Sequence, residues 1–222
     1  MTIQKGEEWG RPSHANTLVT VLRDSELSER VALSKKMSAG LQVQGGDTWL
    51  SLGQPESIRC PGVTWQLSFD AIQVAVGEDE LWAYSSVVLR NPWWRGGVFL
   101  GDIWCVSLTG ILRGRNIAPR AHANDGFIDV LRVSDQMSLR QRFQAWSRAK
   151  RGDHVPHRDI EVTRLKTIRI SSASTMLLKI DGNRIGYVRD IRLEVVPDEW
   201  SVSVPKDVNS DLEATELSDP KL

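Results

Sequence analysis

Apolar and polar positions in the N-terminal part of the chain follow two different periods. Residues 17–22 form a short β-prone run, after which apolar residues recur near helical spacing, with Asp24 and Ser25 as candidate N-caps and Gly40 at the expected helix end. Residues 41–44 form a second β-prone run that leads directly into a glycine pair. The order strand, helix, strand, glycine loop predicts a small parallel α/β unit, with the loop at the carboxyl end of a strand, where such sheets bind ligands.

From about residue 61 the pattern changes to the two-residue period of β-strands. Apolar side chains alternate up to Phe69 and resume at Ile72 after a one-residue slip, which indicates a bulge. A turn near Gly77 and the return of residues 81–89 predict a hairpin, and Asp-Gly-Asn at residues 181–183 is a strong tight-turn signal. Further strand-like runs lie at residues 98–108, 127–133, 160–170, 176–180, 184–188, 191–196 and 201–204.

One helix is expected among these strands. Ser138 is its candidate N-cap, Leu139, Phe143 and Trp146 follow at the spacing of one helix face, and Gly152 marks its end. Between the cap and the end there is no acid, but five basic residues: Arg140, Arg142, Arg148, Lys150 and Arg151. Such a positive face is usually solvated. Together with the aromatic run at residues 93–95, it can also attract anionic lipid head groups.

These patterns predict an α+β chain, with a small α/β fragment joined to a mostly antiparallel β-sandwich. We expect a reduced α/β nucleotide unit in residues 1–60, the sandwich in residues 61–205 and a disordered acidic tail in residues 206–222. A chain of this length buries enough surface to fold without disulfides.

Composition narrows the class of protein. The 222 residues contain 28 Lys plus Arg and 28 Asp plus Glu, so the formal net charge is zero and no cationic field indicates nucleic acid as a partner. The two cysteines, Cys60 and Cys105, have no metal-binding spacing, and the first residues form no apolar leader, so we expect a cytoplasmic protein with reduced thiols. The longest apolar stretch, residues 98–112, contains Asp102 and is too short to span a membrane.

A glycine loop is the first candidate for chemistry. Its residues follow a predicted strand and are Gly45, Gly46, Asp47 and Thr48. Glycines let backbone N–H groups approach phosphate oxygens, and a nearby carboxylate can hold a magnesium ion or a ribose hydroxyl. A plain turn would use the same residues.

A second candidate is the segment that contains Asn124, Asp125 and Asp129. These oxygen ligands suit a hard cation such as Mg²⁺, although Asx residues before a glycine also form ordinary turns. The motifs of serine hydrolases and of Walker loops are absent from the sequence, so hydrolase chemistry has no support.

The order of these parts resembles the diacylglycerol kinase and lipid kinase family, which is related in fold to the NAD kinases. The resemblance rests on Gly-Gly-Asp at residues 45–47, Asp-Gly ahead of a strand at residues 125–126, Asp-Gly at residues 181–182 and a Val-Pro ending, and it is most specific over residues 115–205. It implies a glycine loop that holds ATP, assistance by Mg²⁺ and a lipid hydroxyl that attacks the γ-phosphate.

Carried over by position, the resemblance assigns three groups of residues. Gly45, Gly46, Asp47 and Thr48 would contact the nucleotide, Asn124 and Asp125 would belong to the magnesium network, and Asp181 and Asn183 would form the catalytic turn.

The chain also departs from the family pattern. Thr48 stands where the family loop has a further glycine, so a side chain occupies space beside the phosphate. Asn183 replaces the glutamate expected as general base, and an amide cannot accept a proton near neutral pH. Asp47 and Val63 are too close in sequence for the helix, strand and second nucleotide loop that the family places there.

Two classes of function therefore remain. In the first, the chain transfers phosphate from ATP to a lipid hydroxyl with Mg²⁺, at an impaired rate. In the second, which the chemistry favours, it is a pseudoenzyme that binds a lipid, another small molecule, a nucleotide or a partner without catalysis. Peripheral contact with an anionic membrane and a homodimer are further partners compatible with the sequence.

Overall fold

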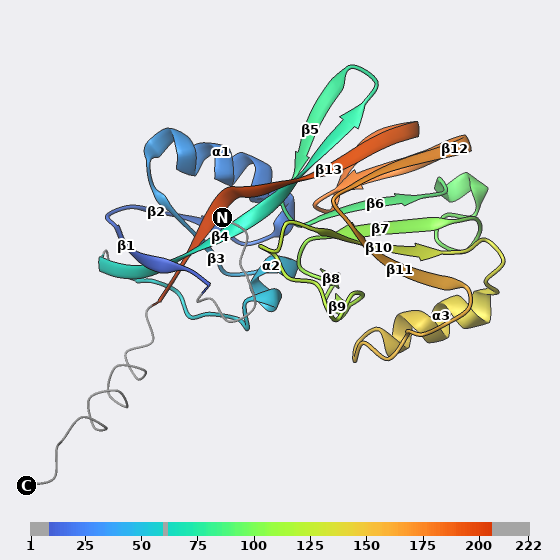
Figure 1. Cartoon of the computed structure of the whole chain (residues 1–222), viewed down its shortest axis with the longest axis horizontal. Helices are drawn as coiled ribbons and strands as arrows, with labels where there is room; N and C mark the ends of the chain where they lie inside the picture. The colour runs from blue at the N-terminus through green and yellow to red at the C-terminus, as the bar shows by residue number, and fades with distance from the viewer. Residues whose placement is uncertain (1–8, 60–61, 206–222) are drawn as a thin grey trace, which may run out of the picture.

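The computed structural model describes residues 9–59 and 62–205, and Figure 1 shows how their elements are arranged. The expected acidic tail at residues 206–222 lies outside the described residues, as does Cys60.

A small parallel unit is formed by the N-terminal residues. β2 (Leu18–Val21) and β3 (Gly40–Val43) pair in parallel, and the 3₁₀ helix η1 (Asp24–Glu26) and α1 (Leu27–Met37) connect them. α2 (Gly46–Ser51) follows β3. This arrangement confirms the predicted strand, helix and strand order, because two parallel neighbours need such a crossover connection.

The N-cap expected for this helix is wrong. Glu26 stands at the N-cap of α1 without a side-chain hydrogen bond to the helix. The carboxylate of Asp24 instead reaches the glycine loop after β3, as described below.

The large sheet of the described residues is antiparallel and contains nine strands. Their order is β1-β4-β13-β12-β6-β7-β10-β11, and β5 pairs with β4 beyond the end of β1. The strands are β1 (Arg11–Ala15), β4 (Gly62–Val76), β5 (Asp79–Ala83), β6 (Ser86–Arg90), β7 (Ile103–Ser107), β10 (Ile128–Val133), β11 (Ile160–Leu165), β12 (Thr167–Ile180) and β13 (Asn183–Pro205). β8 (Ile111–Leu112) and β9 (Arg115–Asn116) form a separate short hairpin. The predicted α+β class is confirmed.

Several strand boundaries differ from the prediction. Three expected runs between residues 184 and 204 are one continuous strand, β13. The expected single run at residues 81–89 is split between β5 and β6, which pair with different neighbours, and residues 98–102 precede β7 without joining it. Local alternation does not reveal such boundaries, because they depend on which partner strand each segment meets.

The bulge expected near Phe69 lies in the partner strand. Ala71 pairs with Val196 and Phe69 pairs with Trp200, so residues 197–199 of β13 face a single residue of β4. At this point the buried side chains of β4 change faces, because Phe69 contributes to one core and Ile72 to another.

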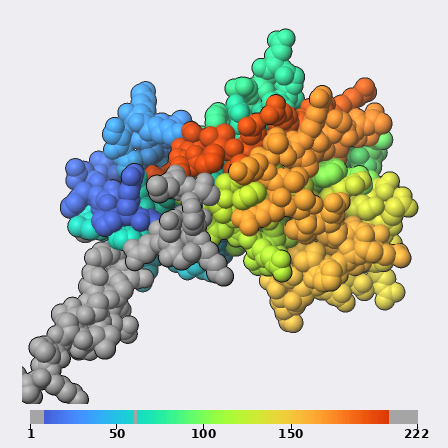
Figure 2. Space-filling model, viewed as in Figure 1, coloured from blue at the N-terminus to red at the C-terminus, as the bar shows by residue number. Residues whose placement is uncertain are grey.

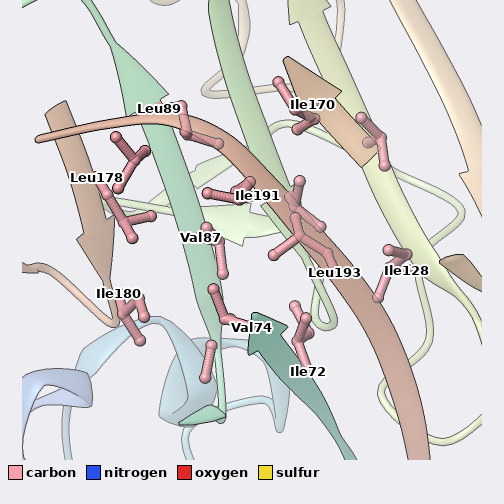
Figure 3. Close-up of a cluster of buried hydrophobic side chains, with 14 of the residues drawn as sticks. Ile72, Val74, Val87, Leu89, Ile128, Ile170, Leu178, Ile180, Ile191 and Leu193 are labelled. Atoms are coloured by element: carbon pink, nitrogen blue, oxygen red, sulfur yellow. The ribbon is translucent and has the colours of Figure 1, made fainter. Parts of the chain in front are cut away.

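The main core is enclosed by the curled sheet. Figure 3 shows side chains of β4, β12 and β13 facing those of β6 and β10, among them Ile72, Val87, Ile128, Leu178 and Leu193. All five are fully buried. This packing of two halves of one sheet produces the predicted sandwich.

A second core joins the small parallel unit to the sheet. Val21 of β2 and Leu27 of α1 pack with Phe69 of β4 and with Trp200 and Val202 of β13. β4 and β13 therefore supply both cores, and β1 hydrogen-bonds to β4. The division into units at residues 60 and 61 stays a prediction.

Helix α3 (Leu139–Arg148) begins at the predicted cap. The Ser138 hydroxyl accepts a hydrogen bond from Gln141 N, and the Gln141 side chain accepts one from Ser138 N, which completes a capping box. The sequence predicts Arg142 on the positive face of the helix. This prediction is wrong, because the Arg142 side chain is buried. α3 lies at the lower right of the molecule in Figures 1 and 2.

No helix within the described ranges has the length and apolarity to cross a bilayer.

Candidate functional site

A carboxylate of the same chain occupies the N–H groups of the glycine loop. Asp24 accepts hydrogen bonds from Asp47 N at 2.5 Å, from Thr48 N at 3.2 Å and from the Thr48 hydroxyl at 2.8 Å. β2 and β3 are parallel neighbours, so residues that follow them lie at the same sheet edge. Asp24 therefore binds where the resemblance would place a phosphate.

The two glycines of the loop make room for protein atoms. A Cβ on Gly45 would overlap the carbonyl oxygen of Leu22. Gly46 has a φ of 87°, and a Cβ there would lie 2.7 Å from the carboxylate atoms of Asp24. The close approach that requires glycine is thus made by the segment that follows β2.

Burial raises the pKa of Asp24 above its ordinary value, while hydrogen bonds from Asp47 N and the Thr48 side chain lower it. The negative charge of Asp47 adds a smaller upward contribution to this pKa. A second anion that bound to the loop would therefore be repelled by the negative charge of Asp24.

Asp47 has a different set of partners. Its carboxylate accepts hydrogen bonds from Arg113 N at 2.6 Å and from Gly114 N at 2.7 Å, in the turn between β8 and β9. Both carboxylate oxygens are therefore engaged in fastening the glycine loop to the β-sandwich.

Asp181 is buried in the turn between β12 and β13. Its carboxylate accepts hydrogen bonds from Tyr84 N at 2.9 Å and from Ser85 N and Ser86 N at 2.8 Å each. Burial raises its pKa to about 7, the three N–H groups lower it, and the charge of Asp24 raises it slightly. Asp181 thus accepts the backbone hydrogen bonds of residues 84–86, where the chain passes from β5 to β6.

Asn183 lies against η1. Its side-chain Nδ2 donates a hydrogen bond to the Ser25 carbonyl oxygen at 2.7 Å. This contact brings the turn at residues 181–183 next to Asp24 and the loop at residues 45–48. Two of the three residue groups assigned from the sequence therefore meet in space.

The third group, Asn124 and Asp125, lies in different surroundings. Asp125 forms an ion pair with Arg164 and accepts a hydrogen bond from Phe127 N at 3.1 Å. Asn124 Nδ2 donates to the Ser68 carbonyl oxygen at 2.9 Å. Burial raises the pKa of Asp125, whereas the charge of Arg164, the hydrogen bond from Phe127 N and the charge of His122 lower it.

Two further buried carboxyls accompany this third group. Asp70 accepts a hydrogen bond from Gly126 N at 2.8 Å, and Asp129 lies on β10. Burial raises the pKa of each to about 6, and the charge of Asp125 adds to both shifts. Even so, the described ranges contain no set of three or more His, Cys, Asp or Glu side chains arranged to hold a metal ion.

A cavity of about 870 Å³ opens beside this third group. Its polar lining includes Arg120, Asp129, His157, Arg158 and Arg164. None of the residues at the glycine loop or at the turn of residues 181–183 lines it. This cavity is thus separate from the expected nucleotide loop.

Sequence reasoning missed the role of Asp24 in the site and did not consider Asp70. Asp24 could have been found, since the residue after one strand of a parallel pair lies beside the loop after the other. The sequence around Asp70 contains no such signal. Its polar side chain interrupts an apolar run because β13, which is distant in sequence, forms a bulge opposite it.

Comparisons with known proteins show what part of this chain resembles. Residues 105–204 match the profile of the YegS C-terminal NAD kinase beta sandwich-like domain. A diacylglycerol kinase of Staphylococcus carnosus (strain TM300) is 29% identical over 118 residues, which are 52% of this chain and 38% of that protein. The chain is similar to diacylglycerol kinase-like lipid kinases, and its residues 105–204 match the β-sandwich domain of that group. Its match to this relative spans well under half of the relative's length.

Solved structures of the family share the fold. A diacylglycerol kinase from Bacillus anthracis str. Sterne aligns with a TM-score of 0.56 and 13% identity, over 83% of this chain and 75% of that one. A putative diacylglycerol kinase from the same organism aligns with a TM-score of 0.58 and 11% identity, over 83% and 77% of the two chains. At such identities the likeness concerns the fold alone.

Proposed function

We propose that this family member binds a lipid and that its glycine loop does not hold a nucleotide phosphate. The observation that carries the proposal is the hydrogen bonding of Asp24 to Asp47 N, Thr48 N and the Thr48 hydroxyl. A phosphate would have to displace a buried carboxylate from these donors and would then lie beside its negative charge.

The residues present do not fit ATP and Mg²⁺ well. Asp47, expected at the nucleotide, is bonded to the backbone of Arg113 and Gly114. Asp125, expected at the metal, is paired with Arg164. Asn183 has an amide where the family resemblance calls for a base, and that amide donates to a backbone carbonyl.

A lipid ligand is supported by the relatives. The matching protein of S. carnosus is named a diacylglycerol kinase, and two solved structures of similar fold carry the same description. The matched profile covers residues 105–204, the part of the β-sandwich from β7 to β13. We place lipid binding in that part.

ATP-dependent lipid phosphorylation is the second candidate. One observation favours it: the glycine loop and the turn at residues 181–183 lie together, joined through η1 by the 2.7 Å contact of Asn183 with Ser25. In this alternative, Asp24 leaves the loop when a nucleotide binds, and Asp181 remains close to the bound nucleotide.

Calorimetric titration with ATP and Mg²⁺ separates the two candidates. We expect no saturable heat at millimolar nucleotide for the parent chain. The Asp24→Ala variant frees the loop donors, and we expect it to gain weak nucleotide binding. Asp79→Ala is the matched control, since Asp79 is an exposed aspartate in the β4–β5 hairpin, and it should behave like the parent.

Radiolabelled phosphate transfer to a diacylglycerol-containing lipid extract gives the second readout. Micromolar ATP binding by the parent together with labelled lipid would overturn the proposal and establish the kinase. Binding of the same extract without transfer, measured by co-sedimentation, is the result we expect.

A further inference from the structure

An exposed apolar surface lies at the end of the sandwich that carries α3. It consists of side chains from the segment at η2 (Trp93–Arg95), the residues that follow it and the first turns of α3, and we call it the docking surface: Trp93, Trp94, Phe99, Leu100, Leu139 and Phe143. Trp93 is 77% exposed and Phe143 is 76% exposed. Soluble proteins seldom expose large aromatic side chains together unless they contact a partner.

Arg142 makes these two segments parts of one surface. Its guanidinium donates hydrogen bonds to the carbonyl oxygens of Val98 at 3.1 Å and Gly101 at 2.7 Å. It also donates to the carbonyl oxygens of Met137 at 3.0 Å and Ser134 at 2.8 Å, just before α3. The aromatic loop and the start of the helix are therefore fixed to the same buried side chain.

The orientation of α3 is the reverse of an ordinary surface helix. Arg142 is buried and Ala145 packs against the core below the helix, whereas Leu139 and Phe143 are exposed. Trp146 is 37% exposed, with the Arg115 guanidinium over its ring. The three exposed residues are spaced at i, i+4 and i+7, so they form one stripe along the helix. An amphipathic helix that keeps its apolar stripe in solvent has a face available for a partner.

The charges beside the stripe indicate the nature of that partner. Arg95, Arg140, Arg148, Lys150 and Arg151 are exposed on the same two segments. Tryptophan, phenylalanine and leucine side chains flanked by arginine and lysine are the composition of helices that lie in the head-group region of a bilayer. Basic residues near an anionic leaflet each strengthen such binding about fivefold.

We propose that the docking surface binds an anionic lipid bilayer, with the aromatic side chains among the head groups and the basic residues at the phosphates. The proposal rests on the lipid binding that the proposed function places in residues 105–204, and it adds the surface and the anionic bilayer as the partner; it does not depend on the glycine loop. It would place the whole chain on the membrane without any transmembrane segment among the described residues.

Vesicle co-sedimentation with the full chain tests the proposal. We expect binding to phosphatidylcholine vesicles that contain phosphatidylglycerol, weaker binding to phosphatidylcholine alone, and loss of binding as salt is raised. The double variant Trp93→Ser, Phe143→Ser should bind anionic vesicles at least tenfold more weakly. Val63→Ser, which replaces an exposed apolar residue on β4, is the matched control and should bind like the parent.

Brominated lipids provide a spectroscopic check. They should quench tryptophan fluorescence of the parent and quench it less in Trp93→Ser, Phe143→Ser. Equal vesicle binding by the parent and the double variant would overturn the proposal. So would a parent that is dimeric in solution by analytical ultracentrifugation and becomes monomeric in the double variant, since a second copy would then cover the surface.

The glycine-loop part of the proposed function and the docking surface fail separately. ATP titration of Trp93→Ser, Phe143→Ser should match the parent, and vesicle binding by Asp24→Ala should also match the parent. A kinase activity found in the parent would remove the proposed function and leave the docking surface unaffected.

Discussion

The glycine loop and the docking surface differ in whether contacts within the protein occupy their side chains. At the loop, the charged side chains of Asp24 and Asp47 are bonded to backbone N–H groups of the same chain. At the docking surface, Trp93 and Phe143 remain largely in solvent. The loop has the sequence of a ligand site but is internally satisfied, whereas the helix has the pattern of a packed element but leaves its apolar stripe exposed.

The difference shows that residue types alone do not identify an interaction site. Glycines and an aspartate in a loop are equally suited to a phosphate and to a carboxylate of the protein. An apolar helical stripe is equally suited to a core and to a lipid surface. The nearest partner of each group decides whether that group is available to a ligand. Single substitutions can change these partners one at a time.

The largest effect is expected at Asp181. Replacement by alanine removes the acceptor of three backbone N–H groups, from Tyr84, Ser85 and Ser86, and should lower the free energy of unfolding by about 4 kcal/mol. Urea unfolding measures this. Asp181→Asn keeps an acceptor oxygen and removes the charge, so its loss should be much smaller. A loss below about 1 kcal/mol for Asp181→Ala would show that the turn does not depend on this carboxylate.

The next effect concerns pH. The folded-state pKa values of Asp70 and Asp129 are raised to about 6, and that of Asp181 to about 7, so the folded protein binds more protons than the unfolded chain above pH 4. Stability should therefore be highest below the unfolded pKa and decline from pH 4 to pH 7, by about 3 kcal/mol for a single shift of this size. Urea unfolding at pH 5 and pH 7.5 tests the sign, and rising stability would contradict it.

Arg142 should have an intermediate effect. Arg142→Met leaves four backbone carbonyls without their donor and should cost about 2 kcal/mol in the free energy of unfolding. It should also weaken vesicle binding, although every docking side chain is retained. Arg140→Met removes an exposed arginine two residues away and should change stability by less than about 0.5 kcal/mol.

The smallest effect is expected from restoring the family residue at position 183. Asn183→Glu loses the hydrogen bond to Ser25 and brings a second carboxylate towards Asp24, which should cost about 1 kcal/mol. It should not produce phosphate transfer, because Asp24 still occupies the loop. Transfer by Asn183→Glu alone would show that the missing base, not the occupied loop, limits activity. Asp24→Ala, Asn183→Glu tests the two changes together.

Sequence alone was sufficient for the elements that local signals define. The parallel unit, the cap at Ser138 and the turn at residues 181–183 follow from short patterns and are present in the structure. The likeness to lipid kinases was also predicted from motifs, and the match over residues 105–204 supports it for that part of the chain.

The features that sequence did not predict depend on contacts between distant segments. The split between β5 and β6 follows from Asp181, nearly one hundred positions later. The burial of Arg142 follows from carbonyl groups of residues 98 and 101 that no helical period reveals. The catalytic, nucleotide and metal roles of the predicted site residues remain predictions, although their positions in the fold are now known.

The strands β4 and β13 run from the small core into the large one and are hydrogen-bonded to each other on both sides of the bulge. A hinge motion between the halves would have to bend this continuous ladder, because no flexible linker separates the two cores within residues 62–76 or 183–205. We therefore expect the molecule to behave as a rigid platform. A lipid that it recognises must fit a preformed face, and closure of one half over the other cannot enclose it.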